Sequence, residues 1–202
     1  MKRIIDILLG VGILIILLLP ILLIALLVRF TSNGKTLYWS DRVGKNGVLF
    51  RMPKFRSMQV DTPTVASHLM TNPNAFLSPI GVFLRRFSLD ELPQLFSILK
   101  GDMSFVGPRP DVPGYADKLQ GEDRNILKLR PGITSVASLK YANEELLLSK
   151  VKDPVDYNNN VIYPDKVKMN LNYYYNHNIW IDIKVIFATI FLLKKSIFIK
   201  ND

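Results

Sequence analysis

The sequence of 202 residues contains no cysteine, which excludes disulfide bonds and thiolate chemistry. Histidine is nearly absent too, and neither His68 nor His177 has a metal-ligating neighbour at helical spacing. This pattern argues against a zinc site. The chain also lacks an internal repeat and a low-complexity tract, and its length suits one domain with a substantial core.

Acidic residues are in deficit. Lys and Arg number 26 against 17 Asp and Glu, which gives a formal net charge of +9. Such an excess indicates a polyanionic partner, namely nucleic acid, anionic lipid or a phosphorylated substrate. Because 49% of the residues are hydrophobic, the composition favours a membrane lipid partner and no nucleic acid.

One long segment lacks charge altogether. Residues 7–28 form a run of 22 uncharged positions. As a helix this run would cover about 33 Å, enough for a bilayer core of about 30 Å, so a single membrane crossing is one interpretation. Pro20 divides the run into arms of 13 and 8 residues and predicts a kink, and neither arm alone is long enough to cross.

The flanks of this segment are basic at both ends, with Lys2 and Arg3 before it and Arg29 and Lys35 after it. Positive charge prefers the cytoplasmic side of a membrane, and here both ends carry it. We therefore expect residues 1–28 to form a re-entrant membrane helix kinked at Pro20. Residues 29–202 would form a cytoplasmic domain resting on the membrane surface. Spanning helices also tolerate proline, so a single crossing remains the alternative.

The remaining pattern predicts an α/β fold that is mostly helical with a small sheet. Asn33-Gly34 and Asn46-Gly47 are typical of hairpin turns between short strands. Residues 84–99 have a helical period, residues 153–165 resemble a polar loop, and the last helices are expected within 166–193. The segments 78–89 and 178–200 combine apolar and cationic residues, which suits amphipathic helices in the membrane interface. For the second segment an ordinary core helix is an equal alternative.

An acidic pair, Asp90-Glu91, lies in the segment "FSLDELPQLF". Ser88 and Glu91 fit a capping box, which would explain the pair as helix stabilisation. Pro93 argues against this explanation, because it falls where a regular helix needs a backbone donor. We therefore expect the pair to lie at a bent junction.

Basic residues surround the pair in sequence. Each of them alone is explained as a solvated surface charge, although Pro108 and Pro110 would stiffen the loop that carries Arg109. An aspartate can attack a phosphoryl group, and a glutamate can hold the Mg²⁺ that bridges phosphate oxygens. The candidate phosphate ligands are Lys54, Arg56, Arg85, Arg86 and Arg109.

Five segments together resemble the bacterial sugar transferases, and more narrowly the small monotopic phosphoglycosyl transferases. The resemblance extends from the amino terminus to about Phe191, and the central block is its most specific part. The segments are "KRIIDILL", "KFRSM", "FLRRFSLDELPQLFSILKGDMSFVGPRP", "RPGIT" and "IDIKVI".

The resemblance implies transfer of a phospho-sugar from a UDP-sugar to a polyprenyl phosphate such as undecaprenyl phosphate, with release of UMP. The reaction would be ping-pong through a covalent phospho-sugar aspartate and would begin surface glycan assembly at the cytoplasmic face of the bacterial inner membrane. By matching motif, Asp90 would be the nucleophile and Glu91, together with Asp90, would bind Mg²⁺. Lys54, Arg86 and Arg109 would contact substrate phosphates. The family's re-entrant helix is broken at a proline, which matches Pro20.

The sequence departs from the commoner family pattern where sugar and nucleotide recognition would be expected. The segment Ser40-Asp41-Arg42 keeps only the arginine of its motif, and Ser135 and Ser138 replace a glycine and a glutamine. Two other classes of function stay open at this point. One is a non-catalytic basic scaffold anchored to the membrane, and the other is a nucleotide-sugar hydrolase that passes a phospho-aspartate to water.

Overall fold

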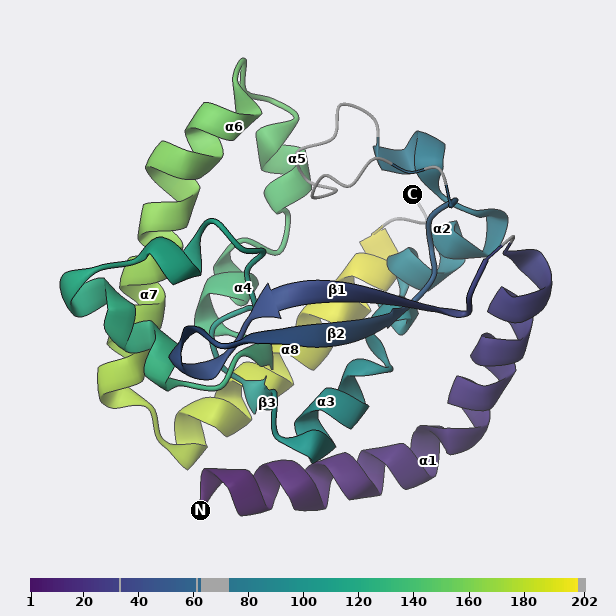
Figure 1. Cartoon of the computed structure of the whole chain (residues 1–202), viewed down its shortest axis with the longest axis horizontal. Helices are drawn as coiled ribbons and strands as arrows, with labels where there is room; N and C mark the ends of the chain where they lie inside the picture. The colour runs from purple at the N-terminus through teal and green to yellow at the C-terminus, as the bar shows by residue number, and fades with distance from the viewer. Residues whose placement is uncertain (33, 61, 63–72, 200–202) are drawn as a thin grey trace.

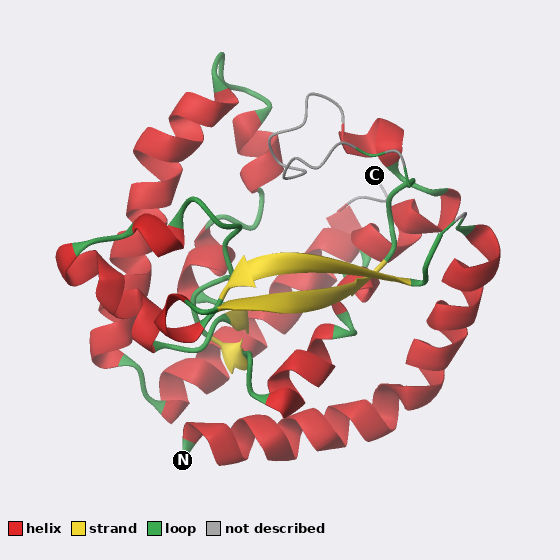
Figure 2. Ribbon diagram, in the orientation of Figure 1, coloured by secondary structure: helices red, strands yellow, loops and turns green. Residues whose placement is uncertain are grey.

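A computed structural model describes residues 1–32, 34–60, 62 and 73–199. His68 and Asn33 therefore lie outside the described residues. Helical segments dominate the fold, and two small sheets lie among them (Figure 2). The α-helices are α1 Lys2–Thr31, α2 Pro79–Arg86, α3 Gln94–Lys100, α4 Val136–Lys140, α5 Glu144–Leu148, α6 Pro154–Tyr157, α7 Tyr163–Asn176 and α8 Ile179–Ile199. The 3-10 and π segments are η1 Lys45–Gly47, η3 Pro73–Phe76, η4 Leu89–Glu91, η5 Ala116–Lys118, η6 Gly121–Lys128 and η7 Asn158–Ile162.

The first sheet is an antiparallel hairpin of β1 Leu37–Val43 and β2 Leu49–Phe55. Its connection contains Asn46 and Gly47, both at positive φ (59° and 80°), so the predicted hairpin turn is confirmed at this dipeptide. The second sheet pairs β3 Ser104–Val106 with β4 Gly132–Thr134 in parallel. In the part of the chain that the structure describes, the predicted small sheet is thus two separate two-stranded sheets.

The long apolar segment forms α1, which runs along the outside of the molecule and changes direction along its length (Figure 1). Pro20 lies inside this helix, and proline is a usual cause of such bends. Among the described residues, α1 is the one helix that by length and composition could cross a membrane. Most of its apolar side chains are exposed, including Leu8, Ile15 and Ile16.

Both arms of α1 nevertheless contact the same body of the protein. In the second arm, Ile21, Ile24 and Val28 are buried in the main hydrophobic core. In the first arm, Gly10 lies against α3 so closely that a Cβ there would be 2.9 Å from Leu99 Cδ2. The other buried members of this core are Met52, Phe55, Leu84, Leu95, Ile98 and Met103.

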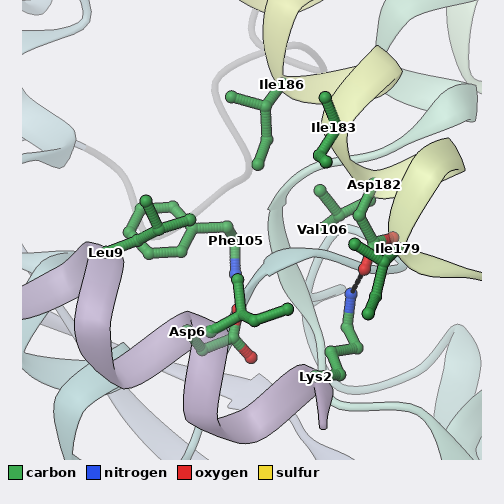
Figure 3. A pocket seen from close by; sticks show the side chains of 10 residues that line it. Lys2, Asp6, Leu9, Phe105, Val106, Ile179, Asp182, Ile183 and Ile186 are labelled. Carbon is green, nitrogen blue, oxygen red and sulfur yellow. Dashed lines mark hydrogen bonds and ion pairs between the residues drawn. The ribbon is translucent and has the colours of Figure 1, made fainter.

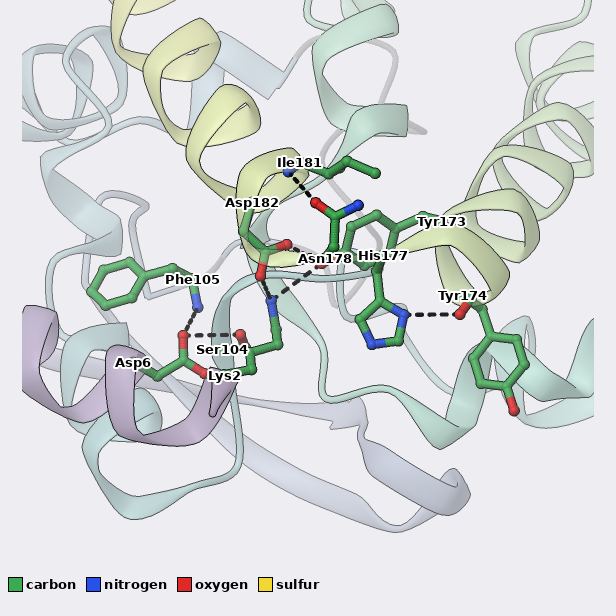
Figure 4. Close-up of polar contacts among 10 residues, drawn as sticks. All are labelled: Lys2, Asp6, Ser104, Phe105, Tyr173, Tyr174, His177, Asn178, Ile181 and Asp182. Atoms are coloured by element: carbon green, nitrogen blue, oxygen red, sulfur yellow. Dashed lines mark hydrogen bonds and ion pairs between the residues drawn. The ribbon is translucent and has the colours of Figure 1, made fainter.

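Polar contacts fix the amino-terminal end of α1 (Figure 4). The Asp6 carboxylate accepts hydrogen bonds from Ser104 Oγ at 3.1 Å and from the Phe105 backbone N–H at 3.2 Å. Lys2 forms an ion pair with Asp182 of α8 and also donates to the Tyr173 hydroxyl at 3.1 Å. Beside these contacts lies a mostly apolar cavity of about 240 Å³ between α1, β3 and α8 (Figure 3).

The carboxyl-terminal part is more helical than the sequence indicates. The prediction of a polar loop over 153–165 is wrong, because α6, η7 and the start of α7 cover most of this range. The Asp153 side chain accepts a hydrogen bond from the Asp156 N–H, and Pro154 occupies the first helical turn, so a good helix start precedes the asparagines. The helices expected within 166–193 are confirmed as α7 and α8.

Candidate active site

The acidic pair lies at a break between two helices. The helical period of residues 84–99 corresponds to two helices: α2 ends at Arg86, and α3 begins only after Pro93. Ser88 has φ 54° and ψ 25°, a left-handed conformation that is uncommon for a residue other than glycine. Its side chain makes no capping hydrogen bond, so the structure does not support the capping box, and the predicted bent junction is confirmed. Backbone strain of this kind, about 1–3 kcal/mol, is common at functional sites.

Glu91 contacts two cationic side chains from distant parts of the sequence. Its Oε1 atom accepts from Lys54 Nζ at 2.8 Å and from Arg109 Nη2 at 2.9 Å. Lys54 lies on β2 and Arg109 follows β3, so the hairpin and the parallel pair both contribute to the cluster. The side chains of Glu91 and Lys54 are 18% and 21% exposed, whereas that of Arg109 is 54% exposed and open to a ligand.

The two carboxylates have opposite electrostatic surroundings. Burial opposes the ionisation of Glu91, but the charges of Arg109 and Lys54 outweigh it and hold its pKa below the usual range. Burial raises the pKa of Asp90, which is 6% exposed, while Lys54 acts in the opposite direction. A pair of carboxylates with separated pKa values is a common feature of active sites.

Two glycines set the position of the loop that carries Arg109. The Gly107 N–H donates to Thr134 O at 3.0 Å, and the Gly132 N–H donates to Pro108 O at 2.9 Å. A Cβ on Gly107 would be 2.2 Å from Arg130 O, and one on Gly132 would be 2.2 Å from Gly107 N. Only glycine therefore permits this approach between the two strands. Pro108 and Pro110 further restrict the loop.

A second charged group lies next to this cluster and was not among the sequence-predicted site residues. Arg42 on β1 donates to Ser40 Oγ at 2.7 Å, and its pKa is lowered by burial and by Arg109. Asp111 faces Arg42, Lys166 and Arg109, yet burial raises its pKa to about 6. The sequence marks Arg42 only as the retained residue of a motif, and nothing in the pattern around Asp111 indicates its surroundings.

Other contacts are seen for the remaining candidate phosphate ligands, Arg56, Arg85 and Arg86. Arg56 Nε donates to Lys35 O at 2.8 Å, and Arg85 Nε donates to Ser57 Oγ at 3.3 Å. The Arg86 guanidinium lies 5.7 Å from the centre of the Phe87 ring. Arg85, the neighbour of Arg86, is close enough to lower the pKa of Asp90. The structure thus joins Lys54 and Arg109 at Glu91 and places Arg86 against an aromatic ring.

The fit of a metal ion depends on the carboxylates of Asp90 and Glu91. Among the described residues there is no group of three His, Cys, Asp or Glu side chains that could hold a metal. Mg²⁺ usually binds through one or two carboxylates together with water and substrate phosphates, so it does not require such a cage. The adjacent Asp90 and Glu91, with Glu91 kept ionised, fit this mode of binding.

Comparison with known proteins identifies the family. The family described as bacterial sugar transferase matches residues 1–196. An uncharacterized sugar transferase of Haemophilus influenzae is 34% identical over 94% of the chain and 40% of the relative. A UDP-glucose:undecaprenyl-phosphate glucose-1-phosphate transferase of Klebsiella pneumoniae is 34% identical over 94% and 39%. An undecaprenyl-phosphate galactose phosphotransferase of Salmonella typhimurium is 33% identical over 94% and 39%.

The chain therefore spans about 40% of the length of these relatives. The family match covers the hairpin that carries Lys54, the junction that carries Asp90 and Glu91, and the glycine-bound loop that carries Arg109. With nearly its whole length matched, this chain belongs to the bacterial sugar transferase family.

Proposed function

We propose that this chain transfers a sugar 1-phosphate from a UDP-sugar to a polyprenyl phosphate, as the names of its relatives indicate for those proteins. The observation that carries the proposal is the cluster at Glu91, where two cations lie beside a buried, adjacent aspartate. Such a cluster suits a diphosphate substrate, because lysine and arginine both bind phosphate oxygens.

In the first step, an Asp90 carboxylate oxygen attacks the β-phosphorus of the donor. The bond from this phosphorus to the bridging oxygen breaks, and UMP leaves with the bonding electron pair. Lys54 and Arg109 bind the phosphate oxygens and offset the repulsion between the anionic nucleophile and the anionic substrate. Arg86 is a weaker candidate for the same role.

In the second step, a phosphate oxygen of the polyprenyl phosphate attacks the same phosphorus and releases the Asp90 carboxylate. The raised pKa of Asp90 makes its carboxylate more basic and hence a better nucleophile than an ordinary aspartate. Glu91 and Asp90 would hold Mg²⁺, and the ion would supply charge stabilisation at the phosphate oxygens.

Membrane attachment through a re-entrant α1 forms part of the proposal. Lys2 is paired with Asp182 of α8, while Val28 near the other end is buried in the core. A helix crossing a bilayer core of about 30 Å would place its two ends on opposite sides, where they could not contact one domain. A cysteine at residue 2 should therefore resist membrane-impermeant reagents added to intact cells, and labelling there would contradict re-entry.

The membrane surface would also contact α8 and α2. Trp180, Phe187 and Phe191 of α8 are at least 67% exposed and lie on one helical face, while Val185 is buried on the other. On α2, Val82 and Phe83 are also exposed. These residues suit interfacial helices lying on the cytoplasmic leaflet.

The decisive experiment measures UMP release by the detergent-solubilised chain with Mg²⁺, undecaprenyl phosphate and a panel of UDP-sugars. We expect one UDP-sugar to give UMP and a lipid-linked product, both dependent on the acceptor. Free sugar phosphate formed without acceptor would instead identify a hydrolase. A folded protein that neither binds nor turns over any donor would support the scaffold.

A further inference from the structure

An open cleft of about 440 Å³ lies among η5, η7 and the start of α7. This volume lies within the range of about 300–1000 Å³ that is typical of small-molecule sites. The apolar cavity beside α1 is smaller, and Asp90 and Glu91 line neither it nor the cleft (Figure 3). The residues of the cleft are Gly114, Tyr115, Lys118, Leu119, Asn159 and Tyr163.

Two tyrosine rings and an amide shape the cleft. The Tyr115 and Tyr163 rings meet edge to face, with their centres 5.1 Å apart. The Tyr115 hydroxyl donates to Asn159 Oδ1 at 3.1 Å. On the other side, the Gly114 N–H donates to Asp117 Oδ1 at 2.7 Å, and its φ of +107° requires glycine. The aromatic rings are thus held before any ligand arrives.

The cleft adjoins the acidic pair through Asp111. Asp111 follows Arg109 by two positions, so their Cα atoms are at most about 7 Å apart. The hydroxyl of Tyr163 is buried next to the Asp111 carboxylate, and the Tyr163 ring lines the cleft. A donor with a phosphate on Arg109 would therefore have another part of its structure within reach of the cleft.

The charge and exposure of the cleft suit a group that leaves. Lys118 and Asn159 are exposed, and Lys118 forms no ion pair with any carboxylate in the part of the chain that the structure describes. The sugar of the donor stays on the phosphorus that Asp90 attacks, whereas the nucleoside departs with the released phosphate. An open cleft in which Lys118 is available to a phosphate therefore suits the nucleoside monophosphate, which is the part of the donor that leaves.

We propose that this cleft binds the nucleoside of the nucleotide-sugar donor, with the base against Tyr115 and Tyr163. The inference rests on the proposed function. Aromatic side chains stack readily on a nucleobase. In this arrangement the exposed Asn159 amide would hydrogen-bond to the polar edge of the base, and Lys118 would contact the phosphate attached to the ribose.

Calorimetric titration of UMP into the detergent-solubilised full chain tests this proposal without requiring turnover. We expect Tyr115→Ala to weaken UMP binding at least 10-fold, and Asn159→Ala to weaken it several-fold. Tyr175→Ala is the matched control, because Tyr175 is exposed on the same helix as Tyr163 and does not line the cleft. Circular dichroism checks that each variant is folded, and Tyr115→Phe, which keeps the ring, should retain most of the affinity.

Titration of glucose 1-phosphate and galactose 1-phosphate separates the two halves of the donor. Their binding should be the same in wild type and in Tyr115→Ala. If the sugar phosphates lose affinity and UMP does not, the cleft holds the sugar and the proposal is wrong. Equal UMP affinity in wild type and Tyr115→Ala, or no UMP binding by wild type, also overturns it. Failure of the proposed function is a separate result, because it appears as absent acceptor-dependent transfer by wild type.

Discussion

Glu91 and Arg109 are 18 positions apart in the chain, and Arg109 Nη2 lies 2.9 Å from Glu91 Oε1. The contact joins the strained junction after Ser88 to the glycine-bound loop after β3. Because Lys54 binds the same oxygen, one carboxylate contacts both side chains that we propose as phosphate ligands. The charges also act on Asp90, the preceding residue, since Lys54 lowers the pKa of Asp90 and Asp90 raises the pKa of Arg109.

Replacement of Asp90 by asparagine removes the proposed nucleophile with little change in shape. We expect Asp90→Asn to abolish UMP release, by at least about 1,000-fold, because an amide cannot form the acyl-phosphate intermediate. A UMP-release assay on purified protein checks this. Asp123→Asn, at an exposed position of η6, is the control and should behave like wild type. Retained activity in Asp90→Asn would remove Asp90 from the nucleophile's role.

The pH dependence of transfer should report the ionisation of Asp90. Its carboxylate must be charged to attack, so kcat should fall as the pH falls through its raised pKa. Because Lys54 lowers that pKa, the acid limb should move to higher pH in Lys54→Met, together with a lower maximum. Lys100→Met removes a cation that is 75% exposed and should leave the limb unchanged. An acid limb at the same pH in both variants would contradict this electrostatic role.

Asp111 should make stability decrease as the pH rises. Its folded pKa of about 6 lies above the ordinary 3.8, so its contribution is most favourable below about pH 4 and is lost as the pH rises through 6. We expect Asp111→Asn to be more stable than wild type at pH 7.5, by on the order of 2–3 kcal/mol, and similar to it at pH 4. Urea unfolding at both pH values measures the difference. Lower stability of Asp111→Asn at pH 7.5 would mean that attraction to Arg42, Arg109 and Lys166 outweighs burial.

The close approach of Gly107 and Gly132 should be intolerant of a methyl group. In Gly132→Ala the new Cβ would lie 2.2 Å from Gly107 N, so the strands must separate. We expect a loss of about 1–3 kcal/mol in stability and a lower kcat, because the Arg109 loop starts at this contact. Gly12→Ala is the matched control, since no atom lies within 4 Å of its Cβ. Equal thermal unfolding of the two variants would show that the loop adapts.

Local chemistry explains what could be predicted from the sequence. Asn46-Gly47 predicts its hairpin because both positions need positive φ, and Pro93 predicts the break because it lacks a backbone donor. The contacts of Glu91 with Lys54 and Arg109 depend on residues 37 and 18 positions away. The sequence pattern identifies these residues as candidates, but it does not show that they lie close together in the fold.

The Asp111 surroundings and the helices over 153–165 depend on further tertiary contacts. Asp111 becomes a half-buried acid with a raised pKa only because β1, which carries Arg42, and α7, which carries Tyr163 and Lys166, pack around it. In the second case, the run of asparagines has weak helix propensity, and Asp153 and Pro154 start a helix that the following residues continue. A prediction from the local sequence pattern therefore misses the raised pKa of Asp111 and underestimates the helix content of residues 153–165.

The contact between α1 and α3 bears on how the site would reach a substrate embedded in lipid. α3 begins three residues after Glu91, and Gly10 allows α1 to lie directly against Leu99 near the end of α3. In the proposed re-entrant arrangement, with α1 in one leaflet, this contact would set the height of Asp90 above the hydrocarbon. The proposed acceptor would then need no extraction from the bilayer, since its phosphate and the attacked phosphorus would meet at a depth fixed by helix contacts.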